Sequence, residues 1–352
     1  MNEDILKILE YAVYAPSGDN SQPWRFEVDG NKIFQYNMAD ADNIFLNFKQ
    51  SGSYVSHGAV IENIVIAASN FGYRVDVALF PDKEEKDLVA VLEIQKDDSV
   101  KKDFSAQFIK ERCTNRRYYF DKGIETEKIN SLISIVKNMN FGNLRFVTSK
   151  EDVEEVGSAS TLMEVIALRN ELVHKLFFSG IVWTEEEHAE KKKGLYLKTL
   201  ELPLPVQYLF RVIKNWNMMS LLNHVGLAEK AAQANAVTNS KSAAFGIITM
   251  KNTNSEDFVN TGRTMQRMWL KATEQGLALQ PITGLLFLSH RVTANETGVL
   301  GSKHVEMIKE GMGTIRKVFS LGGEIPMFMF RLGYAEKPSA HSLRNKPNIS
   351  FR

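Results

Sequence analysis

The hydrophobic pattern of the first hundred residues predicts an ordered series of helices and strands. Apolar side chains recur at helical spacing in some stretches and at alternate positions in others. The predicted elements are a helix, a two-stranded hairpin, a buried helix and two further strands, at residues 5–15, 24–28, 32–36, 58–69, 73–80 and 88–94. Turn formers separate them, because the first helix stops at Pro16-Ser17-Gly18-Asp19-Asn20 and the hairpin turns at Asp29-Gly30-Asn31.

The second half of the chain repeats much of this order. Its predicted elements are a helix, a strand, a long helix and two strands, at residues 129–136, 144–147, 262–273, 277–282 and 326–332. The helices predicted to begin at Gly58 and Gly262 end at glycines the same distance away (72 − 58 = 276 − 262 = 14). The repeated order favours an ancient internal duplication, although any buried helix followed by a strand would give one such aligned segment.

Residues 175–240 have no counterpart in the first half. They contain an acidic run followed by a basic one, a break at Pro203 and Pro205, and an aromatic helix through Phe210 and Trp216. An insertion of this size in one half only is a candidate lid or pocket wall. The alternative is a helical hairpin that covers the edge of a sheet.

Composition and charge exclude several classes of function. The chain has 352 residues, 44% of them hydrophobic, and its 43 Lys+Arg against 42 Asp+Glu give a net charge of +1. No overall field attracts nucleic acid or a membrane surface, and no apolar run is long enough to cross a bilayer. The single cysteine, Cys113, fits a reducing compartment, and the N-terminus lacks the pattern of a signal peptide, so we expect a soluble cytoplasmic protein. The seven histidines show no metal-ligand spacing, so no metal site is predicted.

The most informative segment is a polar turn at residues 15–24, Ala-Pro-Ser-Gly-Asp-Asn-Ser-Gln-Pro-Trp. Pro, Ser, Gly and Asn fix a tight turn with free amides and short polar side chains. Such a turn suits the polar edge of a planar heterocycle. A generic turn would need only Pro, Gly and Asn, so the longer string is the stronger signal.

Three further segments offer ligand contacts. Residues 111–117 hold three arginines, and guanidinium groups pair bidentately with phosphate, although a basic cluster is more often a solvated face. If that segment opens a helix, its free backbone amides would add to the anion site. Residues 276–284 predict a strand running into a Pro/Gly turn, where Gly284 would allow a ligand close to the backbone. The tail around Arg344 is basic and flanked by Pro347.

In this order, the four segments resemble the nitroreductase family of FMN-dependent oxidoreductases. The string at 15–24 is typical of that family, and Arg-x-Thr-Asn-Arg at 112–116 is similar to its tandem, single-chain Acg-type members. The resemblance implies an α+β fold in which two fused repeats, 1–104 and 105–352, form a pseudo-dimer with central mixed or antiparallel sheets surrounded by helices. The family's active unit is an intertwined homodimer, so the fused chain is expected to work as a pseudo-dimeric monomer, with further oligomerisation left open.

The resemblance also implies roles for individual residues, while the flavin itself carries the chemistry and no catalytic side chain is expected. The residues that match contacts to the FMN phosphate and ribityl chain are Arg112, Thr114, Arg116 and, from the tail, Arg344. Those that match contacts to the isoalloxazine ring from the first half are Pro16, Ser17, Gly18 and Asn20. Thr283 and Gly284 match the turn whose backbone faces the flavin N5 edge.

Only one complete set of these contacts exists. The first half lacks an arginine cluster at its start, and the matching turn of the second half, residues 138–143, lacks Pro-Ser. One FMN per chain is therefore expected. The chain departs from the family pattern at Thr283, where many members carry glutamate, and at Ser342, where a basic residue often precedes the tail arginine. The family's basic residue near the flavin N1–C2 carbonyl has no clear match, and Arg169 is the candidate.

Three functions follow from the resemblance and the residues. The first is an enzyme in which FMN takes hydride from NADPH or NADH and passes it by ping-pong exchange to a small planar acceptor such as a nitroaromatic or a quinone. The second is a flavin storage or sequestration protein that residues 175–240 close as a lid, with little turnover. The third, a structural protein that has lost the flavin, leaves the arginines and the polar turn without a purpose.

Overall fold

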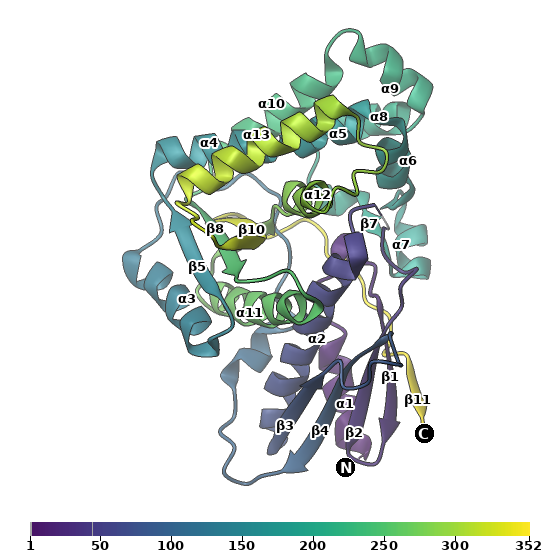
Figure 1. Cartoon of the computed structure of the whole chain (residues 1–352), viewed down its shortest axis with the longest axis vertical. Helices are drawn as coiled ribbons and strands as arrows, with labels where there is room; N and C mark the ends of the chain where they lie inside the picture. Colours follow the sequence, from purple (N-terminus) through teal and green to yellow (C-terminus); the bar gives the residue numbers. More distant parts are fainter. Residues whose placement is uncertain (1, 44) are drawn as a thin grey trace.

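The computed structural model describes residues 2–43 and 45–352, whose strands form two main sheets with helices packed against them (Figure 1). The first sheet has the order β11-β1-β2-β4-β3, with β1 Trp24–Asp29, β2 Lys32–Asn37, β3 Tyr73–Leu79, β4 Leu88–Lys96 and β11 Ile349–Phe351. The second has the order β5-β8-β10-β9, with β5 Asn143–Val147, β8 Ala244–Met250, β9 Ala278–Pro281 and β10 Ile325–Gly333. A small parallel pair joins β6 Ile181–Val182 to β7 Leu195–Tyr196. The predicted α+β class is confirmed.

The two sheets share one pairing pattern once β11 is set aside. In each, the first strand in chain order pairs antiparallel with the second, and the fourth pairs antiparallel with both the second and the third. Strand β11 is the exception, because it joins β1 in parallel at the register Phe26↔Ile349. The end of the chain thus extends the sheet of the first half.

Two long helices cross between the sheets, α2 Ser51–Asn70 and α11 Ser255–Glu274 (Figure 1). Both helices begin seven residues before the predicted starts at Gly58 and Gly262 (58 − 51 = 262 − 255 = 7), so those starts were wrong. The two glycines mark the crossing: a Cβ at Gly262 would lie 1.8 Å from the carbonyl oxygen of Val55, and one at Gly58 would lie 1.9 Å from that of Val259. Glycine is required there because the helix backbones touch.

A single core and a buried ionic network join the two halves across these helices. Apolar residues of both sheets and both long helices form one continuous cluster. Beside it, the carboxylate of Glu62 is 1% exposed and accepts hydrogen bonds from Nε of Arg263 at 3.1 Å and Nε of Arg267 at 2.5 Å. Removing one partner would leave a buried charge without compensation, which is costly. Because Glu62 lies on α2 and both arginines lie on α11, the ion pairs hold the two helices together.

Shorter helices complete the molecule. Those at the outer edges of the helix pair are α1 Asn2–Ala12, packed on α2, and α3 Thr126–Met139, packed on α11. Those over the second sheet are α4 Lys150–Ser160, α5 Leu162–Arg169, α12 Gly284–Thr293 and α13 Ser302–Val318. The short 3-10 turns are Gly18–Asn20, Phe48–Gln50, Phe104–Phe108 and Leu197–Leu200. No helix in the described parts of the chain combines the length and apolar character needed to span a bilayer.

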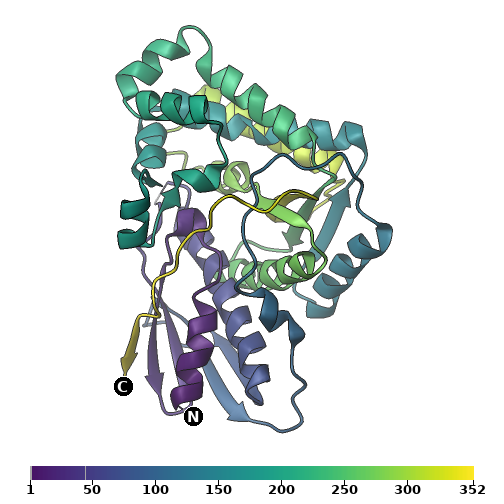
Figure 2. The same cartoon turned by 180° about the vertical axis from the view of Figure 1, so that it is seen from behind.

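Residues 175–240, predicted to have no counterpart in the first half, are mostly helical. The segment begins within α6 Glu171–Ser179 and contains α7 Glu185–Lys191, α8 Leu204–Ile213, α9 Trp216–Asn223 and α10 Leu227–Ser240. Helix α10 packs along α4 and α5, while α8 and α9 form a separate small core with α6. The C-terminal tail leaves β10 and passes this segment on its way to β11 (Figure 2).

Candidate functional site

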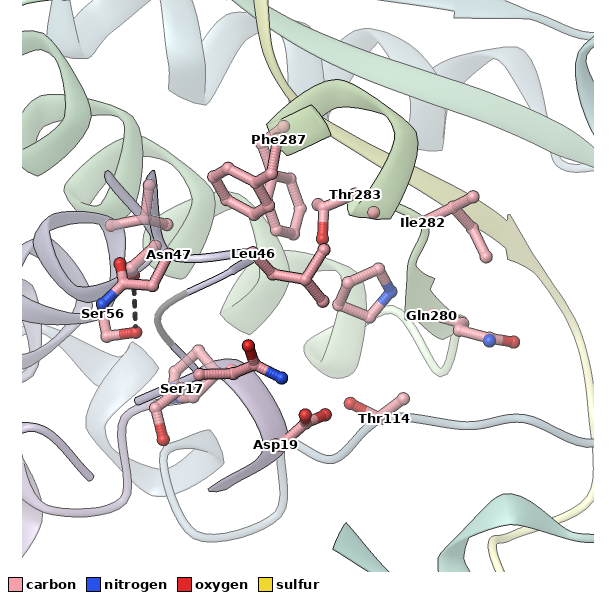
Figure 3. A pocket seen from close by; sticks show the side chains of 18 of the residues that line it. Ser17, Asp19, Leu46, Asn47, Ser56, Thr114, Gln280, Ile282, Thr283 and Phe287 are labelled. Carbon is pink, nitrogen blue, oxygen red and sulfur yellow. Dashed lines mark hydrogen bonds between the residues drawn. The ribbon is translucent and has the colours of Figure 1, made fainter. Parts of the chain in front are cut away.

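A cavity of about 340 Å³, here called the central cavity, lies between the two halves. Figure 3 shows Asp19 and Thr114 on one side of it and Thr283 and Phe287 on the opposite side. Apolar side chains contributed by both halves make up much of its wall, namely Leu46, Val55, Met163, Met265, Trp269, Ile282, Phe287 and Phe328. The cavity is therefore suited to a flat, largely apolar ligand with polar edges.

A second cavity of about 340 Å³, here called the basic cavity, adjoins the first. The two share the wall residues Pro16, Ser17, Asp19, Thr114 and Arg116. The basic cavity is further lined by Lys110, Arg112, the tail residues 340–344, and Leu195 and Thr199. One elongated ligand could therefore extend from an apolar compartment into a cationic one.

The polar turn at residues 16–22 forms the wall common to both cavities. Its backbone is tightly folded, since Asp19, Asn20 and Gln22 all have positive φ, between 45° and 58°. The hydroxyl of Ser17 stabilises the turn by accepting a hydrogen bond from the backbone N–H of Gln22 at 3.0 Å. Gly18 leaves room for the neighbouring carboxylate, because a Cβ there would lie 3.1 Å from Oδ2 of Asp42.

Arg112 and Arg344 are two of the three guanidinium groups that line the basic cavity. Arg112 is 6% exposed, lies over the ring of Trp269 at 4.4 Å and donates through Nη2 to the carbonyl of Tyr14 at 3.2 Å. Burial, followed by the nearby charge of Arg344, lowers the pKa of Arg112 to about 9, and burial lowers the pKa of Arg344 to about 10. Both shifts mean that the charged forms are destabilised where they stand.

Neither guanidinium is neutralised within the described chain. Across residues 2–43 and 45–352, no carboxylate forms an ion pair with Arg112 or Arg344, and the Nε atom of each is buried without a hydrogen-bond partner. Buried donors and charges of this kind are costly unless something pairs with them. An anion between the two arginines would relieve both the repulsion and the missing hydrogen bonds.

Carboxyl groups line the central cavity. Burial raises the pKa of Asp42 to about 7 and that of Glu164 to about 7. Burial also raises the pKa of Asp19, against the opposing charge of Arg116. Asp42 and Glu164 can therefore gain or lose a proton near neutral pH at the wall of the cavity.

The turn before α12 forms the wall of the central cavity opposite Asp19 and Thr114. Thr283 precedes the first residue of that helix, and a Cβ at Gly284 would lie 2.8 Å from Cγ of Met163. The absence of a side chain at 284 thus lets this backbone pack against α5 while its edge faces the cavity.

All ten residues expected at the site line one of the two cavities. Those in the central cavity are Pro16, Ser17, Gly18, Thr114, Arg116, Thr283 and Gly284, and those in the basic cavity include Asn20, Arg112 and Arg344. Asn20 lies away from the central cavity and bonds instead to Arg344. Arg169 lines neither cavity, because it pairs with Glu229 at 2.6 Å. The arginine segment 111–117 does not open a helix but runs as irregular chain.

Several residues that line the two cavities were not predicted from the sequence. Lys110 directly precedes the arginine segment and could have been included with it. Asp19 lies within the polar turn but at one of the two positions that the family pattern leaves free. Asp42 and Glu164 had no signal at all, because only the fold brings them to the cavity.

Comparison with known proteins gives a consistent family. A model described as the nitroreductase family matches residues 109–334. "Uncharacterized protein MT1398" of Mycobacterium tuberculosis (strain CDC 1551 / Oshkosh) is 20% identical over 338 residues, which are 96% of this chain and 46% of that protein. "Putative NAD(P)H nitroreductase MT3217" of the same strain is 28% identical over 118 residues, covering 33% of this chain and 34% of that protein. Each match thus spans less than half the length of the relative, 46% of the first and 34% of the second.

Among solved structures, a nitroreductase with bound FMN from Bacteroides fragilis NCTC 9343 is 11% identical, with a TM-score of 0.39. The match covers 69% of this chain and 94% of that one.

Proposed function

Because the chain belongs to the nitroreductase family, we propose that it binds one FMN across the central and basic cavities and acts as an FMN-dependent oxidoreductase. The observation that supports this most directly is the pair Arg112 and Arg344, whose Nε atoms are buried and which lack any carboxylate partner in the described chain. A phosphate would supply the missing charge, and the adjoining apolar cavity would take a planar ring. The residues present therefore fit the group that the family implies.

Each part of the site has a role in this proposal. Arg112, Arg344 and Lys110 hold the phosphate, and Arg116 and Thr114 face the chain that links phosphate to ring. The turn at Ser17 and the backbone at Gly284 orient the ring from opposite sides. When bound, FMN supplies reversible acceptance of hydride.

The protein's own contribution to turnover is orientation and proton supply. Hydride transfer to a quinone or a nitro group also requires a proton at the acceptor oxygen. The carboxyls of Asp42 and Glu164 can hold that proton at neutral pH, because burial raises the pKa of each to about 7. NADPH or NADH would serve as donor and a small planar molecule as acceptor, in alternation at the same face of the ring.

We further propose that the chain is a fused pseudo-dimer with halves at 1–104 and 105–352, of the tandem Acg type, working in the cytoplasm as a monomer. The shared strand-pairing pattern of the two sheets supports the fused pseudo-dimer, as do the crossing glycines at equivalent positions of α2 and α11. The two cavities draw on both halves but include no residue of 138–143, the second-half counterpart of the polar turn. This supports one FMN per chain.

Flavin storage is the second candidate function. It is favoured by the wall that residues 175–240 contribute to the basic cavity through Leu195 and Thr199. Under this reading the same flavin site forms, but the wall keeps reductants away from it.

A visible spectrum of the purified protein, followed by anaerobic NADPH and then NADH, separates these functions. An oxidoreductase should show bound-flavin absorbance that bleaches within seconds and returns when a quinone is added. Bleaching by dithionite but by neither nucleotide would favour storage. A colourless protein that takes up no added FMN would contradict both.

A further inference from the structure

We propose that residues 185–201 hold the C-terminal tail so that Arg344 points into the basic cavity, which makes Glu201 and His188 positioning residues for the phosphate end of the cofactor. The inference rests on the proposed function, since it concerns the same anion site. It assigns a task to the segment that has no counterpart in the first half.

Glu201 clamps the start of the tail. Its Oε1 accepts hydrogen bonds from the backbone amide of Ser339 at 2.6 Å and from the Ser339 hydroxyl at 3.0 Å. Its Oε2 lies 3.3 Å from Nε of Arg117, and the side chain is only 9% exposed. A charged acceptor with a backbone donor in a shielded place is among the stronger kinds of hydrogen bond.

His188 holds the tail next to the arginine itself. Its Nε2 lies 3.2 Å from the backbone amide of Leu343, which can donate to it only if that nitrogen is unprotonated. His188 is 6% exposed, and its ring stacks on that of Tyr196 with the ring centroids 4.1 Å apart. Burial lowers the pKa of His188, which favours the neutral ring that this bond requires.

The polar turn holds the tail from the other side, and the contacts of Glu201, His188, Asn20 and Gln22 to the tail are together called the clamp. Asn20 donates through Nδ2 to the carbonyls of Lys192 at 3.1 Å and Leu343 at 3.0 Å, and its Oδ1 accepts from Nη1 of Arg344 at 2.6 Å. Gln22 donates to the Lys192 carbonyl at 2.6 Å and accepts from the Asn345 amide at 2.9 Å. The turn, the inserted segment and the tail therefore meet around one guanidinium.

This clamp counters a specific instability. Arg344 faces the like charge of Arg112 and has no carboxylate partner in the described chain, so a free tail would move its guanidinium towards water. Holding the backbone on both sides of residue 344 keeps the charge in place before any anion arrives. Glu201 and His188 would thus raise the affinity for the phosphate without lining the cavity that holds it.

Comparing FMN with riboflavin tests the proposal, because riboflavin lacks the phosphate. In Glu201→Ala and in His188→Phe, which keeps an aromatic ring on Tyr196, the Kd for FMN should rise about tenfold while the Kd for riboflavin changes less than about twofold. Glu201→Gln, which retains an oxygen that can accept from Ser339, should lose less. The matched control is Glu229→Ala, outside residues 185–201, whose exposed partner is Arg169 at 2.6 Å rather than the tail.

The outcomes are distinguishable by fluorescence titration of apoprotein. A selective loss of FMN affinity supports the clamp. Equal losses for FMN and riboflavin, or no loss for either, would overturn it. If the wild-type chain binds neither flavin, the proposed function fails together with the clamp.

Discussion

Replacing Arg344 with methionine should weaken FMN binding by about a hundredfold, equivalent to about 3 kcal/mol. The guanidinium is half-buried beside Arg112, and its Nε has no partner in the described chain, so the phosphate would be its main counter-charge. Methionine fills similar space without a charge. Fluorescence titration of apoprotein with FMN measures the effect directly.

Stability separates this result from simple misfolding. The Arg344→Met substitution removes one of two repelling cations as well as the hydrogen bond to Asn20, so we expect the melting temperature of the apoprotein to change little. The increase in melting temperature that FMN gives to the wild type should largely disappear. Lys346→Met, two residues along and exposed, is the control and should bind FMN normally. Unchanged FMN affinity in Arg344→Met would remove the tail from the phosphate site.

Replacing Gly262 with alanine should cost more than about 4 kcal/mol of unfolding free energy or prevent folding. Helix propensity alone predicts the opposite sign, since alanine in a helix interior is favoured over glycine by about 0.5–1 kcal/mol. The added Cβ would lie 1.8 Å from the carbonyl oxygen of Val55, and backbone cannot move aside as a side chain can. The helices would have to separate, opening the core that both halves share.

The test is urea unfolding followed by the fluorescence of tryptophan, which includes the buried Trp269 on the same helix. Gly58→Ala should behave alike, because its Cβ would lie 1.9 Å from the Val259 carbonyl oxygen. Gly313→Ala is the matched control in α13, where an added Cβ meets nothing within 4 Å, and it should leave stability unchanged or slightly higher. A Gly262→Ala protein as stable as the wild type would mean that the helices do not cross this closely.

The order of elements could be predicted well from local pattern, and their ends less well. Strands with clear alternation and a turn signal, such as the hairpin at 24–37, were placed within a residue or two. The starts of α2 and α11 were missed because glycine resembles a helix boundary when only propensity is considered. Strand β8 was not predicted because all seven of its residues are buried, so its sequence shows no alternation of apolar and polar positions.

The residues that line the two cavities could be predicted where the sequence carries an unusual motif. A turn with three positive-φ polar residues and a cluster of arginines leave marks in the sequence. By contrast, Asp42 and Glu164 look like ordinary surface acids, and only the folding of distant segments buries them. Arg169 was a wrong candidate for the cavity because sequence position cannot show that Glu229 lies beside it.

The most direct test of the account is the number of FMN molecules that one chain binds. Apoprotein at a concentration well above the Kd should be titrated with FMN, with bound flavin followed by fluorescence quenching and protein determined by amino-acid analysis. Saturation at one FMN per chain is expected, because a single polar turn faces a single arginine segment in the described residues. Saturation at two would mean that residues 138–143 build a second site, and no saturable binding would mean that the paired arginines serve another anion.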